Sequence, residues 1–437
     1  MKRYSEYKDS GVKWIGEIPR HWECRKLKTL LLSPLQYGAN ASGVPYSEHL
    51  PRYIRITDIT LEGKLKHSDK LSLSNEDAAK YILKDKDILF ARSGASVGKT
   101  FLYKKEYGLS AFAGYLIKAE LGKELIPELL FYFTQSDIYE SWKNGIFIQS
   151  TIQNIGADKY SQLQIAIPPL PEQEAIVTYL DSKVAKIDEY IAIAEKKIAA
   201  LEELKQTIIA EAVTRGIHKE VPMKDSGVKW IGMIPEHWKM KSLRSYVKLY
   251  SEKNHPEKQL LSVTREMGVI VRNTESKEEN HNFIPDDLSG YKLVRKGDFV
   301  INKMKSWQGS YGVSKYEGIV SPAYYVCKLE FPYNDFFSIA IRCKSYVPFF
   351  TQYSKGIRVD QWDLSPIALK NIPFMEPPIA EQQEIVTYIE AKVANINQLC
   401  QAERSQIEKL KEYKQRLISD VVTGKVKVTN DSLNGRV

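Results

Sequence analysis

The sequence has few of the residues that metal sites, disulfide scaffolds and membrane anchors require. Its 437 residues hold four cysteines, none at C-x-x-C spacing, and seven histidines that do not cluster. This pattern argues against structural zinc and against a disulfide framework. No apolar run approaches the ~20 residues that span a bilayer. The first residues, MKRYSEYKDSG, lack the apolar core of a signal peptide. We therefore expect a cytoplasmic protein with no membrane partner.

A complete nucleotide-binding loop is also missing, although one segment resembles it. The segment ILFARSGASVGKTFLY, residues 88–103, contains Gly-Lys-Thr, but Gly94 and Gly98 enclose only three residues. The motif G-x-x-x-x-G-K-[ST] needs four, and it needs a helix directly afterwards. Here the continuation TFLYKKEYG is typical of a strand. A P-loop NTPase is therefore an alternative that the spacing disfavours.

No other catalytic pattern is complete. The Pro pairs in IPPL and EPPI lack the polar and aromatic neighbours of an amino-methyltransferase loop, and PDDLSGYK at 285–292 is a chance-level match to a nuclease cluster. His21-Trp22 recurs as His237-Trp238, which is more typical of a packed, hydrogen-bonded corner than of a general base. The sequence predicts no enzyme and no cofactor bound by this chain.

What the sequence does contain is an internal duplication. KDSGVKWIGEIPRHW at 8–22 matches KDSGVKWIGMIPEHW at 224–238 in all but two positions. PPLPEQEAIVTYLDSKVAKI at 168–187 matches PPIAEQQEIVTYIEAKVANI at 377–396 in twelve of twenty. The two matches are offset by 216 and 209 residues, so the blocks between them differ in length, but matches in the same order identify repeated structural units. The chain is a tandem of two units, each with an opening segment, a divergent block and a closing segment.

Positive charge lies in the divergent blocks. The net charge is +4 over residues 20–166 and +7 over 223–374, but −3 over 167–222 and zero over 375–437. The total of +9 is modest and is shared by many proteins without a polyanionic partner. Its distribution favours two basic blocks that bind a polyanion, separated by segments that do not.

The closing segments predict long helices. In the first, apolar residues alternate steps of four and three, at Ile187, Ile191, Ala194, Ile198, Leu201 and Ile208. The second repeats this with Ile396, Cys400, Ile407, Leu410, Leu417 and Val421, although Glu403 and Lys414 interrupt the stripe. This is a coiled-coil seam. A helix over 172–214 would be roughly 65 Å long. Because the two units are near-copies in one chain, we expect a pseudo-twofold axis that lays the two long helices antiparallel against each other. The alternative is that each helix is an ordinary amphipathic helix lying on one core.

The basic blocks predict a mixed α/β (α+β) fold with the same element order twice. We expect strands at 53–59, 87–92, 100–105 and 114–121 and a helix at 127–142, then strands at 260–266, 297–304 and 323–330 and a helix at 336–353. When Asp87 is aligned with Asp298, NKMKSWQGSYG takes the position equivalent to the Gly-Lys-Thr loop. Each loop follows a predicted strand that ends in a cationic residue.

Together these motifs closely resemble the specificity (S, HsdS) subunit of type I restriction-modification systems. The resemblance rests on DSGVKWIGEIPRHW, DILFARSGASVGKT, IPPLPEQEAIVTYL and the duplication, and covers essentially the whole chain. It implies two target-recognition domains, at 1–166 and 217–374, each reading one half of a bipartite double-stranded DNA target. It also implies helices at 167–216 and 375–424, packed as an antiparallel coiled coil, before a tail at 425–437.

The resemblance implies a non-catalytic subunit in a larger complex. Two methylation subunits would bring S-adenosylmethionine, and restriction subunits, docked through them, would bring ATP and Mg²⁺ chemistry. The alternative from another class is a two-headed coiled-coil scaffold that binds sugar or protein and no DNA.

Candidate contact residues follow from side-chain chemistry, since Arg, Gln and Asn read purines while Lys and Ser more often hold phosphates. For DNA we predict Arg55, Arg92, Ser93, Lys99, Gln149 and Asn154 in the first block, and Arg265, Lys303, Lys305, Trp307, Arg358 and Gln361 in the second. Arg55 could instead pair with Asp58. For the methylation subunits we predict Glu172, Gln173, Glu381 and Gln382, although Pro-Pro-x-x-Glu-Gln could equally cap the start of the helix.

Overall fold

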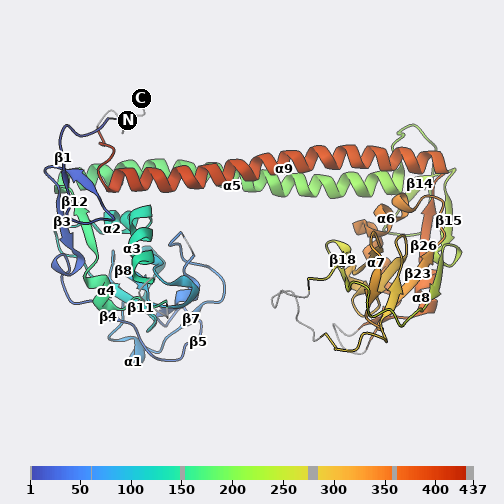
Figure 1. Cartoon of the computed structure of the whole chain (residues 1–437), viewed down its shortest axis with the longest axis horizontal. Helices are drawn as coiled ribbons and strands as arrows, with labels where there is room; N and C mark the ends of the chain where they lie inside the picture. Colours follow the sequence, from blue (N-terminus) through green and yellow to red (C-terminus); the bar gives the residue numbers. More distant parts are fainter. Residues whose placement is uncertain (1, 61, 148–152, 274–283, 357–361, 430–437) are drawn as a thin grey trace. The chain divides into compact units, whose positions relative to one another are not determined.

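Two helices dominate the described structure. α5 spans Leu170–Arg215 and α9 spans Ile379–Val422, of 46 and 44 residues. The computed structural model describes residues 2–60, 62–147, 153–273, 284–356 and 362–429. The chain divides into two units, residues 1–194 with 404–437, and residues 195–403. Each unit therefore contains one basic block and a stretch of both long helices (Figure 1).

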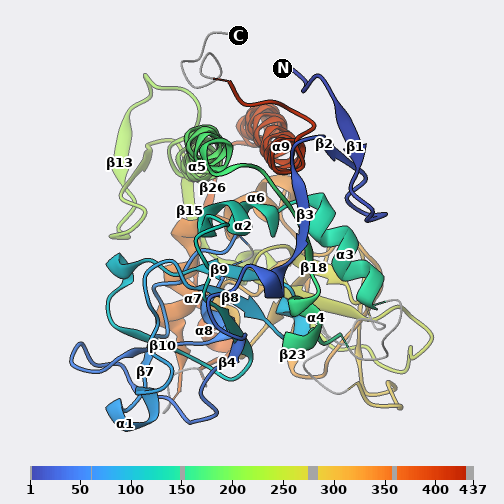
Figure 2. The ribbon, with the colours of Figure 1, turned by 90° about the vertical axis from the view of Figure 1, so that its left-hand side faces the viewer.

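In each unit the stretch of α5 packs antiparallel against the stretch of α9. In the second unit Lys197 pairs with Glu403 and Lys205 Nζ donates to Asn397 Oδ1 at 3.3 Å, so partner numbers fall as residue numbers rise. Most of the predicted heptad positions are buried, Ile187, Ala194, Ile396, Cys400, Ile407, Leu417 and Val421 among them. Figure 2 shows the two helices adjacent near their ends. The predicted packing of one long helix on the other is confirmed.

The first unit builds two four-stranded sheets, ordered β4-β11-β8-β9 and β10-β6-β7-β5, and two strand pairs, β1-β2 and β3-β12. Its strands are β1 (Tyr7–Asp9), β2 (Glu17–Pro19), β3 (Glu23–Lys26), β4 (Gln36–Tyr37), β5 (Val44–Pro45), β6 (Arg52–Ile54), β7 (Leu71–Ser72), β8 (Ile88–Ala91), β9 (Thr100–Leu102), β10 (Ser110–Phe112), β11 (Leu116–Ala119) and β12 (Gln164–Ile167). Its short helices are α1 (Asn75–Ala78), α2 (Pro127–Phe133), α3 (Asp137–Phe147) and α4 (Ala157–Ser161).

The second unit repeats the central sheet as β16-β23-β20-β21. Its strands are β13 (Met223–Asp225), β14 (Met233–Pro235), β15 (Lys239–Ser242), β16 (Val247–Tyr250), β17 (Leu261–Thr264), β18 (Gly268–Val271), β19 (Lys292–Val294), β20 (Phe299–Asn302), β21 (Tyr311–Val313), β22 (Gly318–Val320), β23 (Tyr324–Leu329), β24 (Ser354–Lys355), β25 (Asp363–Leu364) and β26 (Pro373–Glu376). Its short helices are α6 (Asn334–Arg342), α7 (Val347–Tyr353) and α8 (Pro366–Asn371).

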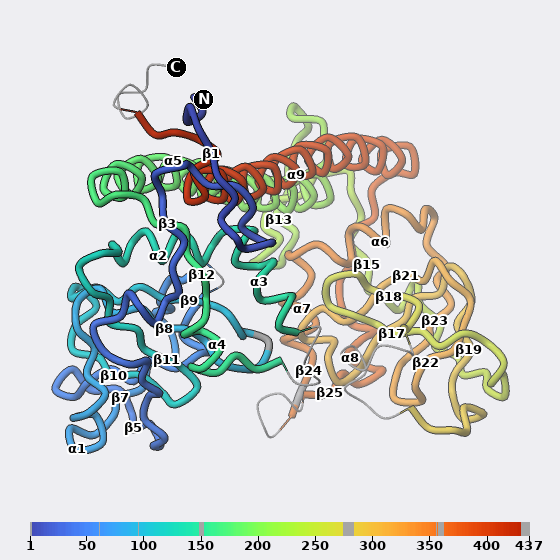
Figure 3. Tube along the Cα trace, turned by 60° about the vertical axis from the view of Figure 1, so that its left-hand side comes forward, coloured from blue at the N-terminus to red at the C-terminus, as the bar shows by residue number. Residues whose placement is uncertain are grey.

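A strand pair closes each basic block just before its long helix. β3 pairs antiparallel with β12, with Glu23 opposite Ile167, and β15 pairs in the same way with β26, with Lys239 opposite Glu376. Figure 3 shows β3 and β12 side by side although well over a hundred residues separate them. The start and end of each block therefore meet at the base of the helix that follows.

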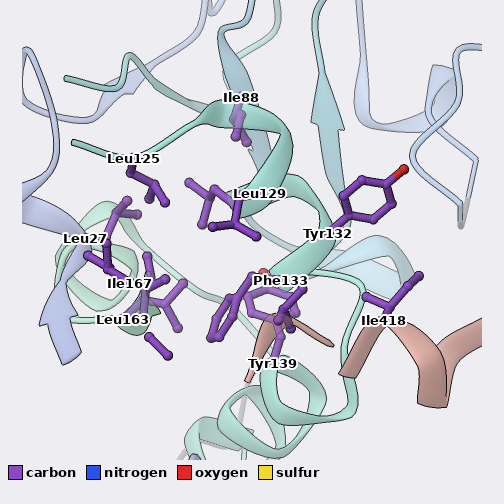
Figure 4. Close-up of a cluster of buried hydrophobic side chains, with 14 of the residues drawn as sticks. Leu27, Ile88, Leu125, Leu129, Tyr132, Phe133, Tyr139, Leu163, Ile167 and Ile418 are labelled. Atoms are coloured by element: carbon purple, nitrogen blue, oxygen red, sulfur yellow. The ribbon is translucent and has the colours of Figure 1, made fainter. Parts of the chain in front are cut away.

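The core of the first unit joins its basic block to the long helices. Leu129, Phe133 and Tyr139, from α2 and α3, share one buried cluster with Ile176 of α5 and Ile418 of α9. Figure 4 shows Ile418 on this cluster, beside Tyr132 and Tyr139. The second unit has an equivalent cluster that includes Ala212 and Val213 of α5 and Ile385 of α9. The helices are part of each hydrophobic core.

Three predicted elements differ from the structure. The segment 53–59 is a strand only to Ile54 and then forms a 3-10 turn at Ile56–Asp58. The predicted helix 127–142 breaks into α2 and α3, where the Ser136 hydroxyl donates to the Phe133 carbonyl and accepts from the Tyr139 amide. Such local bonds compete with the helical ladder. The helix at 336–353 breaks at Cys343, whose backbone is extended.

Candidate nucleic-acid interface

The end of β8 brings three predicted residues together. The Ile155 amide donates to the Arg92 carbonyl at 2.8 Å, and Ser93 forms an isolated β-bridge with Asn154. The guanidinium Nε of Arg92 donates to Asn154 Oδ1 at 3.3 Å. Asn154 is exposed and Arg92 is half-buried. A charged donor and an amide thus lie side by side at the surface.

Tyr37 of β4 supports this pair. Its ring centroid lies 5.2 Å from the guanidinium carbon of Arg92, within reach of a cation–π interaction. Its hydroxyl accepts a hydrogen bond from the Ala157 amide at 3.0 Å, at the first turn of α4. The ring is fixed at one end by a helix terminus and contacts the arginine with its face. The sequence did not single out Tyr37, because β4 is only two residues long.

The Gly-Lys-Thr loop has a structural explanation. It forms a 3-10 turn at Gly94–Ser96 and runs into the strand β9, where a phosphate loop would start a helix. Gly98 has a φ of +81°, its carbonyl accepts from the Tyr139 hydroxyl at 2.9 Å, and a Cβ there would collide with the Lys143 side chain. Burial, assisted by nearby Lys66, lowers the pKa of Lys99. The glycines allow the turn and its packing on α3.

The second unit has the same arrangement with different side chains. β20 ends at Asn302, and the Leu364 amide donates to the Lys303 carbonyl at 3.1 Å, as Ile155 does to Arg92. Lys303 Nζ lies 3.1 Å from Asp363 Oδ2, and these side chains are 30% and 49% exposed. Asp363 occupies the place of Asn154. The sequence prediction included Lys303 but missed Asp363, because its position depends on this backbone pairing.

Aromatic residues flank the second pair. The rings of Trp307 and Trp362 lie 5.3 Å apart, and Trp362 directly precedes Asp363. Lys305 is exposed in the same loop. Arg265, also exposed, forms an ion pair with its neighbour Glu266 in the turn between β17 and β18. These predicted residues lie on surface loops of the second unit.

Arg55 has a different environment. Its guanidinium makes two hydrogen bonds to buried Asp58, at 2.7 and 3.1 Å, and one to the Asp69 carbonyl at 2.8 Å. These bonds favour the alternative stated for Arg55, a structural ion pair. Gln149, Arg358 and Gln361 lie outside the described residues, so their predicted role stays a prediction.

The residues predicted to contact methylation subunits lie at the helix starts, where Gln173, Glu381 and Gln382 are buried and Glu172 is partly buried. Gln173 and Gln382 are buried, and each donates from its amide to the carbonyl of a preceding proline, Pro168 or Pro377. Glu172 accepts from His21 and Trp22, and Glu381 accepts from His237 and Trp238. This bonding favours the alternative for Pro-Pro-x-x-Glu-Gln, a helix-start motif that docks the opening segment.

The described residues include no metal site of His, Cys, Asp or Glu and no membrane-spanning helix. No group of three or more His, Cys, Asp or Glu among them could hold a metal ion. No helix in the described parts of the chain is both long enough and apolar enough to cross a membrane.

Comparison with known proteins agrees with the fold. A family model described as the type I restriction modification DNA specificity domain matches residues 53–203. The MjaX specificity subunit of Methanocaldococcus jannaschii is 26% identical and covers 97% of this chain and 98% of its own length. The StySPI specificity subunit of Salmonella potsdam is 24% identical, covering 86% and 82%.

Solved structures share the fold. A chain from a study of the assembly and conformational transition of a type I restriction-modification system aligns with a TM-score of 0.68 at 15% identity, covering 94% of this chain and 99% of that one. The HsdS subunit of Thermoanaerobacter tengcongensis aligns with a TM-score of 0.50 at 16% identity, covering 94% and 98%.

The structure is a duplicated mixed α+β unit with one strand-end polar pair in each copy and two long paired helices. In sequence the chain is similar to type I restriction-modification specificity subunits over nearly its whole length, and residues 53–203 match the family model of their DNA specificity domain.

Proposed function

We propose that this chain is the DNA sequence-recognition subunit of a type I restriction-modification complex and is not itself catalytic. Each recognition domain reads one half of a bipartite, asymmetric target. The long helices set the distance between the half-sites and dock the methylation subunits. The proposal rests on the similarity to type I specificity subunits and on the chemistry of the two strand-end loops.

One observation carries the proposal. Arg92 and Lys303 occupy equivalent backbone positions, yet one pairs with an amide and the other with a carboxylate. A shared frame with different hydrogen-bonding side chains is what a reader of two different half-sites needs, because base edges are distinguished by donor and acceptor pattern. A scaffold that held two copies of one ligand would need identical side chains there.

The bond-making chemistry belongs to the partners in this proposal. Two methylation subunits supply S-adenosylmethionine and transfer its methyl group, and restriction subunits, docked through them, supply ATP and Mg²⁺ chemistry. This chain supplies binding energy, orientation and sequence choice. Lys99 is followed by the strand β9 and not by the helix that a nucleotide-phosphate loop requires, which argues against a nucleotide site at this loop.

We place the methylation-subunit contacts on the helix face turned away from the recognition domains. In the first unit the recognition domain contacts α5 through hydrogen bonds from the Tyr132 hydroxyl to Asp181 and from Lys64 Nζ to Asp188. Tyr190 follows Asp188 by two residues, about 200° around the helix. Its side chain is 59% exposed, and that of Tyr413 in α9, next to the Lys414 that bonds Asp188, is 49% exposed. Exposed aromatic side chains of this kind are typical of protein interfaces.

The same pattern recurs in the second unit. Leu399 and Leu204, 49% and 48% exposed, occupy the repeat positions of Tyr190 and Tyr413. Gln206 lines the groove that faces the recognition domain, so Leu204 lies on the opposite side of α5. A patch that occurs once in each unit fits two copies of the same partner. In this proposal the patch, and not the hydrogen-bonded helix-start residues, is the docking surface.

The function is tested by DNA binding of the chain assembled with its methylation subunit. Sequence selection from a random duplex pool should recover one bipartite motif. Affinity for that motif should fall steeply with salt, because phosphate contacts release counterions. The matched control is the same assembly with a duplex in which one half-site is scrambled.

Other outcomes identify the rival classes. A two-headed scaffold would recover no motif and bind DNA weakly and without sequence preference. Saturable ATP binding by the isolated chain, abolished by Lys99→Ala, would instead support a nucleotide site. Either result would overturn the proposed function.

A further inference from the structure

The two strand-end pairs are equivalent in backbone and opposite in hydrogen-bonding character. Arg92 with Asn154 and Lys303 with Asp363 are each joined by one backbone hydrogen bond from the following residue and one side-chain contact. Asn154 and Asp363 have the same shape and differ only in one terminal group. The difference between the two units at this site is therefore chemical.

The first pair presents donors. Arg92 donates from Nε to Asn154 Oδ1. The two terminal nitrogens of Arg92 and the amide nitrogen of Asn154 then have no hydrogen-bond partner in the described part of the chain. Tyr37 restrains the guanidinium plane. In the major groove, guanine offers two neighbouring acceptors, N7 and O6, which match a guanidinium donating through two nitrogens.

The second pair presents a donor beside an acceptor. Lys303 Nζ contacts Asp363 Oδ2, while Oδ1 has no partner among the described residues. A carboxylate repels phosphate oxygens, so this pair is unsuited to hold the DNA backbone. Carboxylates in the major groove accept from the exocyclic amine of cytosine, and adenine carries the other such amine, at N6.

We propose that these two pairs are the base-reading elements of the chain. Arg92 with Asn154 selects guanine in one half-site, and Lys303 with Asp363 selects a base that presents an exocyclic amine in the major groove, cytosine or adenine, in the other. The inference rests on the proposed function and deepens it, because it assigns which side chains set specificity and which base chemistry each one requires.

Two isosteric substitutions test the assignment, Asn154→Asp and Asp363→Asn, each in the chain assembled with its methylation subunit. Asn154→Asp places a carboxylate where guanine acceptors would lie, so preference for guanine at one position of one half-site should fall on the order of tenfold or more. Asp363→Asn should change preference at one position of the other half-site by a similar factor. The untouched half-site serves as the internal reference in each case.

Phosphate contacts would give a different result. If Lys303 and Asp363 only position the backbone, Asp363→Asn removes a negative charge and raises affinity for all sequences alike, with unchanged base preference. That outcome, or unchanged selection in both variants, overturns the assignment. If the unsubstituted assembly selects no motif, the proposed function itself has failed, and the two failures are thereby distinguished.

Matched controls lie at the other end of the same sheets. Lys84 pairs with Glu120 near the start of β8, and Lys248 pairs with Glu330 beyond β23. Glu330→Gln removes one negative charge, as Asp363→Asn does, and Glu120→Gln changes one charge of the first unit in the direction opposite to Asn154→Asp, both at the opposite end of the strands. They should leave the selected motif unchanged.

Discussion

At the scale of single residues, the recurring His-Trp dipeptides are structural. Trp22 and Trp238 are fully buried, and each donates its indole N–H to a carboxylate in the first turn of a long helix, Glu172 or Glu381, at 3.0 Å. Tyr4 also donates to Glu172, at 2.9 Å. The sequence-based interpretation of His-Trp as a packed corner is confirmed. The repeated opening segments are locked to the repeated closing segments of the same unit.

The bonds on Glu172 predict a pH effect. Burial raises the pKa of Glu172, but hydrogen bonds from Trp22, His21 and Tyr4 outweigh it and hold the pKa below its usual value. Their contribution is therefore present above the unfolded pKa of about 4.3 and is lost as pH falls through the lower folded pKa. Glu172→Gln should cost about 1–2 kcal/mol at pH 7, and less below pH ~4. Urea unfolding at both pH values checks this.

The control for that substitution is Glu174→Gln, which removes the same charge from an exposed position on the same turn. It should change the free energy of unfolding by less than about 0.5 kcal/mol. Equal effects of the two substitutions would contradict the assigned bonds.

A glycine at each helix end completes the same corner. Gly424 follows α9 with a φ of +72°, and a Cβ there would collide with the Pro19 ring at 2.4 Å and lie 3.1 Å from the Trp22 ring. Gly424→Ala should destabilise the first unit by more than about 1 kcal/mol, because the left-handed conformation and the ring both disfavour a side chain. Thermal unfolding measures the effect.

The opposite sign is expected for Gly145→Ala. Gly145 lies in α3 with nothing within 4 Å of a built Cβ. Alanine is the better helix former by up to about 1 kcal/mol, so this variant should be neutral or more stable. A loss of stability similar to that of Gly424→Ala would contradict the conclusion that Gly145 has room for a side chain and Gly424 does not.

Residue-level prediction succeeded where chemistry and local sequence coincide. A cation at a strand end identified Arg92 and Lys303, and the Asp three residues after Arg55 gave its alternative partner. Tyr37 and Asp363 were missed because they reach the site through pairings with residues 55 and 60 positions away. No local pattern marks such contacts.

At the scale of elements, two polar pairs interrupt the apolar seam between the long helices. Lys414 bonds Asp188 in the first unit at 2.6 Å, and Lys205 bonds Asn397 in the second, at positions that correspond in the repeat. Both lysines are mostly buried. The sequence counted Lys414 as a break in the stripe. Polar pairs at seam positions are the best-attested means of fixing register, at a cost in stability.

The first of these pairs predicts a mutational effect. Burial raises the pKa of Asp188, but Lys414 and Lys64 outweigh it and lower the pKa overall. Asp188→Asn leaves two lysines without a carboxylate and should destabilise the first unit by about 1–2 kcal/mol at pH 7. Asn397→Asp, the reciprocal change, should stabilise the second unit by up to about 1 kcal/mol. Urea unfolding of both variants tests the pairing, and opposite signs to these would refute it.

Element prediction followed periodicity. The heptad pattern placed the first helix at 172–214, and α5 runs from Leu170 to Arg215. The central strands of both sheets were located within a few residues. Short edge strands and the break between α2 and α3 were missed, because two-residue pairings and a serine hydroxyl on the backbone leave no periodic signal.

At the scale of the whole molecule, the two recognition domains should be separable in function. Replacing residues 20–166 with the matching block of a relative should change one half of the DNA motif and leave the other half intact. The strand pair β3-β12 supports these boundaries, because the block starts and ends at one place. Motif recovery from the host methylome checks the result. Changes in both halves would contradict independent reading.

The docking surface predicts a change in stoichiometry. Tyr190→Glu with Tyr413→Glu places two charges on the proposed patch of the first unit and should leave an assembly with one methylation subunit. The matched control is Tyr46→Glu, an exposed tyrosine on the recognition domain. Mass measurement of the purified assembly distinguishes one bound copy from two. Two retained copies would place the docking surface elsewhere.

The duplication predicted the tandem organisation but not how the chain completes each unit. By sequence the first repeat ends at residue 216, whereas the first spatial unit also takes in residues 404–437. Antiparallel pairing explains the difference, since the end of each long helix packs at the start of the other. The stretch of α9 that completes the first unit is far away in sequence, so only the tertiary structure reveals it.

The completion of the first unit by residues of α9 has a consequence for biosynthesis. The first unit contains Leu417, Ile418 and Val421 in its core, and the Lys427 amide donates to the Lys2 carbonyl. The ribosome makes those residues only after residues 195–403 have been made. Residues 1–194 are therefore made first, but their hydrophobic core is completed only by residues made after 403. A translation product that ended before those residues would leave part of the apolar core of the first unit exposed to solvent.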